Sequence, residues 1–180
     1  MKKRWFLLGL VFLLSASLAF AEFGFELGAQ IPIGMGALSD SLGLSSDYAD
    51  IISVAGFLPI PTASLLFQGG LGSFKLGGGI RVYSLILASM AYPQIQAELG
   101  LGNLSLDLSL GGFLLGYYAI GGHGGLETID LMLTELSLWY SLGARKLFRV
   151  GLGAIGFIPT SFDLSSGMPF LFYGGFKVAL

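Results

Sequence analysis

The sequence predicts an all-β protein, namely an eight-stranded antiparallel transmembrane β-barrel that follows a cleaved signal peptide. The 180 residues are 54% hydrophobic and 11% charged, with a mean hydropathy of +0.80, whereas soluble domains carry about 25% charged residues. Apolar and polar residues alternate in segment after segment, as in strands with one face in apolar surroundings. After residue 21 the chain has no apolar run of the roughly 20 residues that a spanning helix needs. A closed barrel is the other structure that satisfies its backbone in lipid.

The first 21 residues have the three parts of a secretory signal peptide. Lys2, Lys3 and Arg4 precede an apolar run from Trp5 to Phe20, which ends in the small-residue pattern of a cleavage site, Ala19-Phe20-Ala21. The alternative, an uncleaved anchor helix, would be short for a span. The sequence therefore predicts a signal peptide at 1–21 and one barrel domain at 22–180.

The first four predicted strands span 23–35, 57–68, 74–86 and 93–101. In the first, every odd position from Phe23 to Met35 is apolar, and the even positions are small or polar. The second alternates around Ser64, but Pro59 and Pro61 cannot donate to a ladder, so its upper part is expected to be irregular. The third and fourth alternate in the same way, with charged or amide side chains on one face.

The last four predicted strands span 104–115, 129–142, 147–158 and 170–180. Gly102-Asn103 is expected to be a tight turn between 93–101 and 104–115, which makes this pair the clearest hairpin of the chain. In the other three strands, leucine, valine or phenylalanine alternates with serine, glycine, tyrosine or a charged residue. Eight is an even number, as bacterial barrels require.

The connections between these strands alternate in length. Those at 69–73, 102–103 and 143–146 are short, whereas those at 36–56, 87–92, 116–128 and 159–169 are mostly longer. Short periplasmic turns and longer extracellular loops are typical of outer-membrane barrels. Six acidic residues lie in or beside the long connections: Asp40, Asp47, Asp50, Glu127, Asp130 and Asp163.

Over its whole mature length the chain resembles the small eight-stranded outer-membrane barrels of the OmpX, OmpA-barrel and OmpW families. The resemblance is one of architecture, since these eight alternating segments carry no diagnostic motif. It implies a place in the bacterial outer membrane, with membrane lipid and the barrel-assembly machinery as partners. For barrels of the OmpW type it also implies passage of small hydrophobic molecules.

An eight-stranded barrel is just wide enough for its own side chains to fill. Strand parity places eight charged residues in its lumen, as four acids and four bases: Glu26, Lys75, Arg81, Glu98, Asp107, Glu135, Arg149 and Lys177. Glu98 should lie opposite Asp107, Arg81 should lie opposite Glu98, and closure of the barrel should bring Glu26 near Lys177. We interpret the set as a salt-bridge plug of the lower lumen, and a proton or ion relay is the alternative.

The same parity predicts an apolar cup above the plug. Its lining should comprise Tyr83, Leu85, Phe113, Leu115, Leu133, Ile155, Phe157, Leu171 and Tyr173, with Leu58, Ile60 and Leu131 nearby. Such a lining suits a small hydrophobic ligand. Two alternatives remain, a packed hydrophobic plug and a parity slip at a bulge such as Gly111-Gly112, which would turn part of this set toward lipid.

Other chemistry finds little support in the sequence. His123 lies among glycines, where a loop would hold it poorly against a nucleophile even with Glu127 and Asp130 nearby, so we expect no enzyme. The chain has no cysteine, no calcium-loop spacing at Asp40, Asp47 and Asp50, and no basic patch for nucleic acid. We therefore expect neither a metal nor a cofactor.

The predicted function is an outer-membrane barrel that binds or passes a small hydrophobic molecule through the apolar upper lumen, with the lower lumen closed by charge pairs. The alternative is a structural or surface-interaction barrel that acts, like an adhesin, through its acidic extracellular loops.

Overall fold

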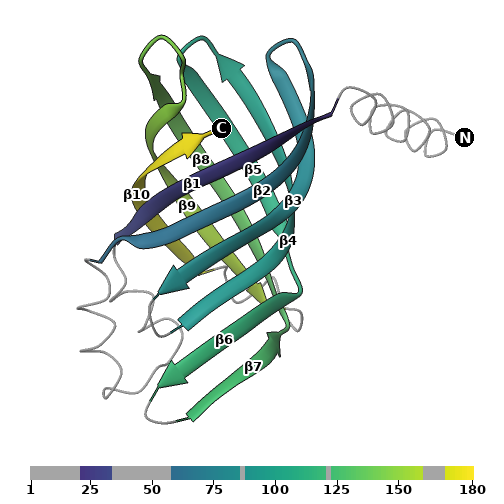
Figure 1. Ribbon diagram of the computed structural model, residues 1–180, viewed down its shortest axis with the longest axis vertical. Helices are drawn as coiled ribbons and strands as arrows, with labels where there is room; N and C mark the ends of the chain where they lie inside the picture. Colours follow the sequence, from purple (N-terminus) through teal and green to yellow (C-terminus); the bar gives the residue numbers. More distant parts are fainter. Residues whose placement is uncertain (1–20, 34–57, 86–87, 121–122, 160–168) are drawn as a thin grey trace, which may run out of the picture.

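A computed structural model describes residues 21–33, 58–85, 88–120, 123–159 and 169–180 of the chain, which form ten strands (Figure 1). The strands are β1 (Glu22–Ile33), β2 (Ile60–Leu71), β3 (Phe74–Leu85), β4 (Ala88–Leu101), β5 (Leu104–Gly111), β6 (Leu114–Ile120), β7 (His123–Ile129), β8 (Leu131–Leu142), β9 (Phe148–Pro159) and β10 (Phe170–Ala179). Within these ranges no helix is long and apolar enough to cross a membrane. The predicted signal peptide lies outside the described residues, apart from Ala21.

Eight of the strands close into an antiparallel barrel, as the sequence predicts. Neighbouring strands follow the order β3-β2-β1-β10-β9-β8-β5-β4, and pairing of β3 with β4 closes the ring. The first and last strands meet at a seam in which Gly28 lies opposite Lys177, and Glu26 reaches Lys177 with an N–O distance of 3.0 Å. The predicted closing pair is therefore present.

Two of the short connections are two-residue hairpins at the same end of the barrel, which we call the short-turn end. Leu71 pairs with Phe74 around Gly72-Ser73, and Leu101 pairs with Leu104 around Gly102-Asn103. Gly72 and Gly102 have φ of 64° and 73°, and a positive φ at the first loop position is the type II′ pattern that matches strand twist. Figure 1 shows the C-terminus and the start of β1 at this end as well.

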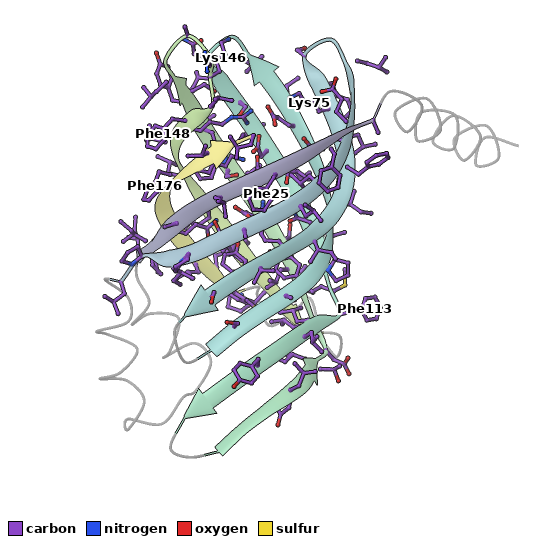
Figure 2. All side chains as sticks on the ribbon, in the orientation of Figure 1. Phe25, Lys75, Phe113, Lys146, Phe148 and Phe176 are labelled. Atoms are coloured by element: carbon purple, nitrogen blue, oxygen red, sulfur yellow. The ribbon has the colours of Figure 1, made fainter. Side chains whose placement is uncertain are left out.

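The two faces of the wall differ in character, in the way that lipid contact requires. Large apolar side chains such as Phe23, Ile95, Leu108 and Leu152 are exposed on the outside, while serine, glutamine and charged side chains are buried in the lumen. Figure 2 shows Phe148 and Phe176 on the outer face, where their rings stack with centroids 6.1 Å apart. An apolar exterior around a closed, polar-centred barrel is the construction of a transmembrane barrel of the bacterial outer membrane.

The connection between β3 and β4 is shorter than predicted, and this changes the register. Leu85 pairs with Ala88, so that Arg81 lies opposite Tyr92 and Lys75 lies opposite Glu98. The prediction that Arg81 faces Glu98 is therefore wrong. The reason is geometric, because shortening a hairpin loop slides every pair of its ladder along the partner strand.

A β-bulge interrupts the predicted strand 104–115. Gly111 pairs with Gln94 and Leu115 pairs with Ala91, so four steps on this strand match three steps on β4. Phe113 has a φ of 55°, which is rare for a residue with a side chain. The extra residue ends β5, and the chain continues as β6 with the opposite parity.

The connection 116–128, predicted as a loop, belongs to a further hairpin. β6 pairs with β7 from Leu114 and Ile129 to Ile120 and His123, and its other edge pairs with β4. Figure 1 shows this hairpin as an extension beyond the far end of the barrel. His123 therefore begins a strand and does not lie in a free loop.

Two adjacent glycines of β10 give a matched test of packing in the wall. A Cβ on Gly175 would lie 2.8 Å from the carbonyl oxygen of Ala29, whereas a Cβ on Gly174 would meet no atom within 4 Å. We expect Gly175→Ala to lower the free energy of unfolding by about 1–3 kcal/mol, since overpacking forces the strands apart. Gly174→Ala should leave it unchanged or raise it slightly. Urea unfolding of both variants in lipid vesicles checks this, and equal stabilities would contradict the close fit of β10 on β1.

Candidate ligand cavity and the charged layer beneath it

A cavity of about 350 Å³ occupies the lumen at the far end of the barrel, and we call it the cup. Six of the nine residues predicted to form it line its wall: Tyr83, Leu133, Ile155, Phe157, Leu171 and Tyr173. Ile60, also expected in this region, lines it as well. The side chains come from β2, β3, β8, β9 and β10, so the cup lies within the ring and not in a surface groove.

Two residues assigned to the cup by parity lie elsewhere. Phe113 is 87% exposed and points away from the barrel (Figure 2), and Leu115 is 41% exposed. Leu114, between them, is fully buried and takes the inward place. The bulge at Gly112-Phe113 is the cause, because one extra residue reverses which side chains face the lumen. Leu85 lies in β3, but its side chain is outside the described part of the structure.

Several residues of the cup were not predicted. Gln30 and Pro32 lie on β1, and Met90 lies on β4. The parity that points Glu26 inward also points Gln30 and Pro32 inward, so the sequence did hold a signal for these two. Met90 fell in a predicted connection. Gly116, Tyr117, Glu127 and Ile129 complete the cup from the β6–β7 hairpin, which the sequence did not reveal as strands.

The charged residues lie in a layer between the cup and the short-turn end. This charged layer comprises Glu26, Arg81, Glu98, Asp107, Glu135, Arg149 and Lys177, all of them buried or nearly so. Glu98 and Asp107 lie directly opposite one another, as predicted. The eighth predicted member, Lys75, is exposed and lies toward the short-turn end (Figure 2). Lys75 lines an open basin of about 870 Å³ that lies on the short-turn side of the charged layer.

Glu135 is the centre of the half of the charged layer that is nearer the cup. It forms an ion pair with Arg81, and the Tyr173 hydroxyl donates a hydrogen bond to it. The amide nitrogen of Gln30 donates to the same carboxylate at 3.3 Å. Arg81 in turn donates to the hydroxyl of Ser64 at 3.0 Å. Both carboxylate oxygens therefore have partners, as burial of a charge requires.

Lys177 is the centre of the half of the charged layer that is nearer the short-turn end. Its ammonium group lies 3.0 Å from a carboxylate oxygen of Glu26 and 2.9 Å from one of Asp107. It also lies 4.8 Å from the ring centroid of Trp139, within the range of a cation–π interaction. Arg149 pairs with Glu98 at 3.2 Å and takes the role that the sequence assigned to Arg81.

The charged layer itself is closely filled. A cavity of about 10 Å³ lies among Arg81, Glu135 and Lys177, which is about the least that holds one water molecule. Gln30 lines both the cup and this space. Between the cup and the basin, the described part of the lumen therefore holds paired charged side chains and little empty space.

Within the described residues, no group of three or more histidine, aspartate or glutamate side chains is placed to hold a metal ion. Asp40, Asp47, Asp50 and Asp163 lie outside the described residues, whereas Glu127 lines the cup and Asp130 joins β7 to β8. The arrangement has a cavity with a largely apolar lining at one end and ion pairs in the middle.

Comparison with known proteins yields fold-level likenesses. No family model matches the chain, and no curated protein matches it. The N-terminal β-barrel domain of Pseudomonas aeruginosa OprF is similar, with a TM-score of 0.49 and 9% identity over 89% of this chain and 99% of that one. Neisserial surface protein A (NspA) has a TM-score of 0.43 and 8% identity over 87% and 94% of the two chains. The assignment of the barrel rests on the strand pairing described above.

Proposed function

We propose that this outer-membrane barrel binds a small hydrophobic molecule in the cup. The molecule enters the cup from the outer face of the membrane, and it leaves through the same opening or laterally into the lipid. The observation that carries the proposal is the cup itself. Its volume of about 350 Å³ and its largely aliphatic and aromatic lining suit a small apolar ligand. The ion pairs that fill the charged layer favour this function over an axial channel, and the proposal involves no catalysis.

The proposal predicts how two lysine substitutions act on the binding of an apolar dye. N-phenyl-1-naphthylamine should bind the folded barrel saturably, and Phe157→Lys should lower its affinity at least about 100-fold, because an ammonium group would take up apolar volume in the cup. Leu115→Lys is the matched control, since Leu115 lies outside the lumen, and it should change the affinity by less than about twofold. Fluorescence titration in nanodiscs, with empty nanodiscs subtracted, gives both values.

The outcome separates the proposal from the loop-based alternative. Equal dye binding by the parent and Phe157→Lys barrels would contradict a binding cup. A barrel that acts through its acidic connections would instead lose its phenotype on deletion of residues 38–54 and keep it after Phe157→Lys.

A further inference from the structure

We infer that the cup selects neutral apolar molecules and rejects charged amphiphiles, because the charges of Glu135 and Arg81 next to the cup balance one another. This inference rests on the proposed function and specifies its ligand class. It begins from two polar side chains that line the cup on the side of the charged layer, Gln30 and Tyr173.

Each of these two side chains donates a hydrogen bond to Glu135. Tyr173 is 1% exposed, and its hydroxyl donates to Oε1 of Glu135. The amide nitrogen of Gln30 donates to the same oxygen. The other oxygen, Oε2, pairs with Arg81. One carboxylate thus lies against one guanidinium next to the cup, and the donors of Gln30 and Tyr173 are engaged.

A ligand on this side of the cup meets no uncompensated charge. A sulfonate, carboxylate or ammonium group would lose its hydration on entering the cup and would gain no counter-ion there, because Arg81 and Glu135 already neutralise one another. At the mouth, Glu127 of β7 lines the cup. A neutral molecule carries no charged group that would lose its hydration.

The cup also limits size. An engineered cavity of about 150 Å³ accommodates benzene, and the cup is about twice as large at about 350 Å³. We therefore infer a neutral ligand with the bulk of two or three small rings or of a short branched chain.

The test uses two dyes that share one framework. N-phenyl-1-naphthylamine is neutral, and 8-anilino-1-naphthalenesulfonate adds a sulfonate to the same rings. The full barrel is titrated with each in zwitterionic phosphatidylcholine nanodiscs, and empty nanodiscs of the same composition serve as the blank for dye dissolved in lipid. We expect the neutral dye to bind at least about 100-fold more tightly than the sulfonate.

Two variants locate the selection. Glu135→Gln leaves the charge of Arg81 without its carboxylate, so the sulfonate should gain at least about tenfold in affinity relative to the neutral dye. Glu127→Gln removes the carboxylate at the mouth and should change that ratio by less than about threefold. If Glu135→Gln does not fold, the dye ratio of the parent and of Glu127→Gln decides alone.

The possible failures are distinguishable. Equal affinities of the two dyes for the parent barrel would overturn the inference and leave the proposed function intact. Recovery of sulfonate binding in Glu127→Gln would also overturn it, because the selection would then reside at the mouth and not beside Glu135. Binding of neither dye would overturn the proposed function together with the inference.

Discussion

Replacing Glu135 with alanine is expected to lower the free energy of unfolding by about 3–5 kcal/mol. Glu135 is 4% exposed and pairs with Arg81, so the substitution leaves a guanidinium charge in the lumen without its counter-ion. It also removes the acceptor of the Tyr173 hydroxyl. A buried donor without a partner adds about 1–3 kcal/mol of cost in its own right, although water that enters the space left by the side chain would reduce it.

The measurement is urea unfolding in phosphatidylcholine vesicles, followed by the fluorescence of Trp139, which lies in the hydrophobic core cluster with Tyr173. The double variant Arg81→Met with Glu135→Leu is the matched control. It removes both charges, so it should recover most of the lost stability even though the ion pair is absent. Lys75→Ala, at an exposed position, should lie within about 0.5 kcal/mol of the parent. A loss of less than about 1 kcal/mol in Glu135→Ala would show that the pair with Arg81 is hydrated.

The sequence predicts the ring of strands well because strict alternation determines parity wherever one face is polar. In the parts of 129–142, 147–158 and 170–180 nearer the short-turn end, serine, glycine and charged residues mark the inner face: Glu135, Ser137, Ser141, Arg149, Gly151, Gly153, Gly175 and Lys177. β8, β9 and β10 accordingly lie where these segments place them. The same parity brings Glu26 and Lys177 together at the seam.

Hydropathy could not decide between continuous parity and the alternative named above, a slip at a bulge near Gly111-Gly112, which is what the structure has. The residues from Gly111 to Leu115 are glycine or apolar on both parities, so neither face is marked as the lumen. The shift becomes determined when β6 pairs with β4 at Leu115 and Ala91. As a result, two of the predicted cup residues lie outside and Leu114 lies inside.

The length of the connection between β3 and β4 is the second feature that the sequence did not predict. Apolar and polar residues do not alternate regularly around Ser89, Met90 and Tyr92. The sequence therefore predicts a longer connection between β3 and β4 than the structure has. Glu98 consequently faces Lys75 in the ladder and takes Arg149 as its ion-pair partner. Composition determined that the lumen would hold acids and bases in near balance, but the pairing among them depends on register, which local sequence does not encode here.

Replacing Lys177 with methionine is expected to have the other large effect, because this one ammonium group serves two carboxylates on different strands. Glu26 lies on β1 and Asp107 on β5, and both are buried beside Lys177. After the substitution, Glu26, Glu98 and Asp107 would share Arg149 as the remaining cation of this half of the charged layer. We expect a loss of about 3–5 kcal/mol in the free energy of unfolding.

The loss should arise from uncompensated charge and not from missing contact area, since methionine is an unbranched side chain that keeps most of the apolar volume of lysine. The triple variant Lys177→Met, Glu26→Gln, Asp107→Asn separates these causes, because it removes the ammonium group and both partner charges together. It should recover at least half of the loss. Urea unfolding and heat-modifiable gel migration report the result, and Lys177→Met should open the β1–β10 seam at lower urea concentration than the parent. If Lys177→Met is as stable as the parent, the ion pairs with Glu26 and Asp107 do not hold the seam closed.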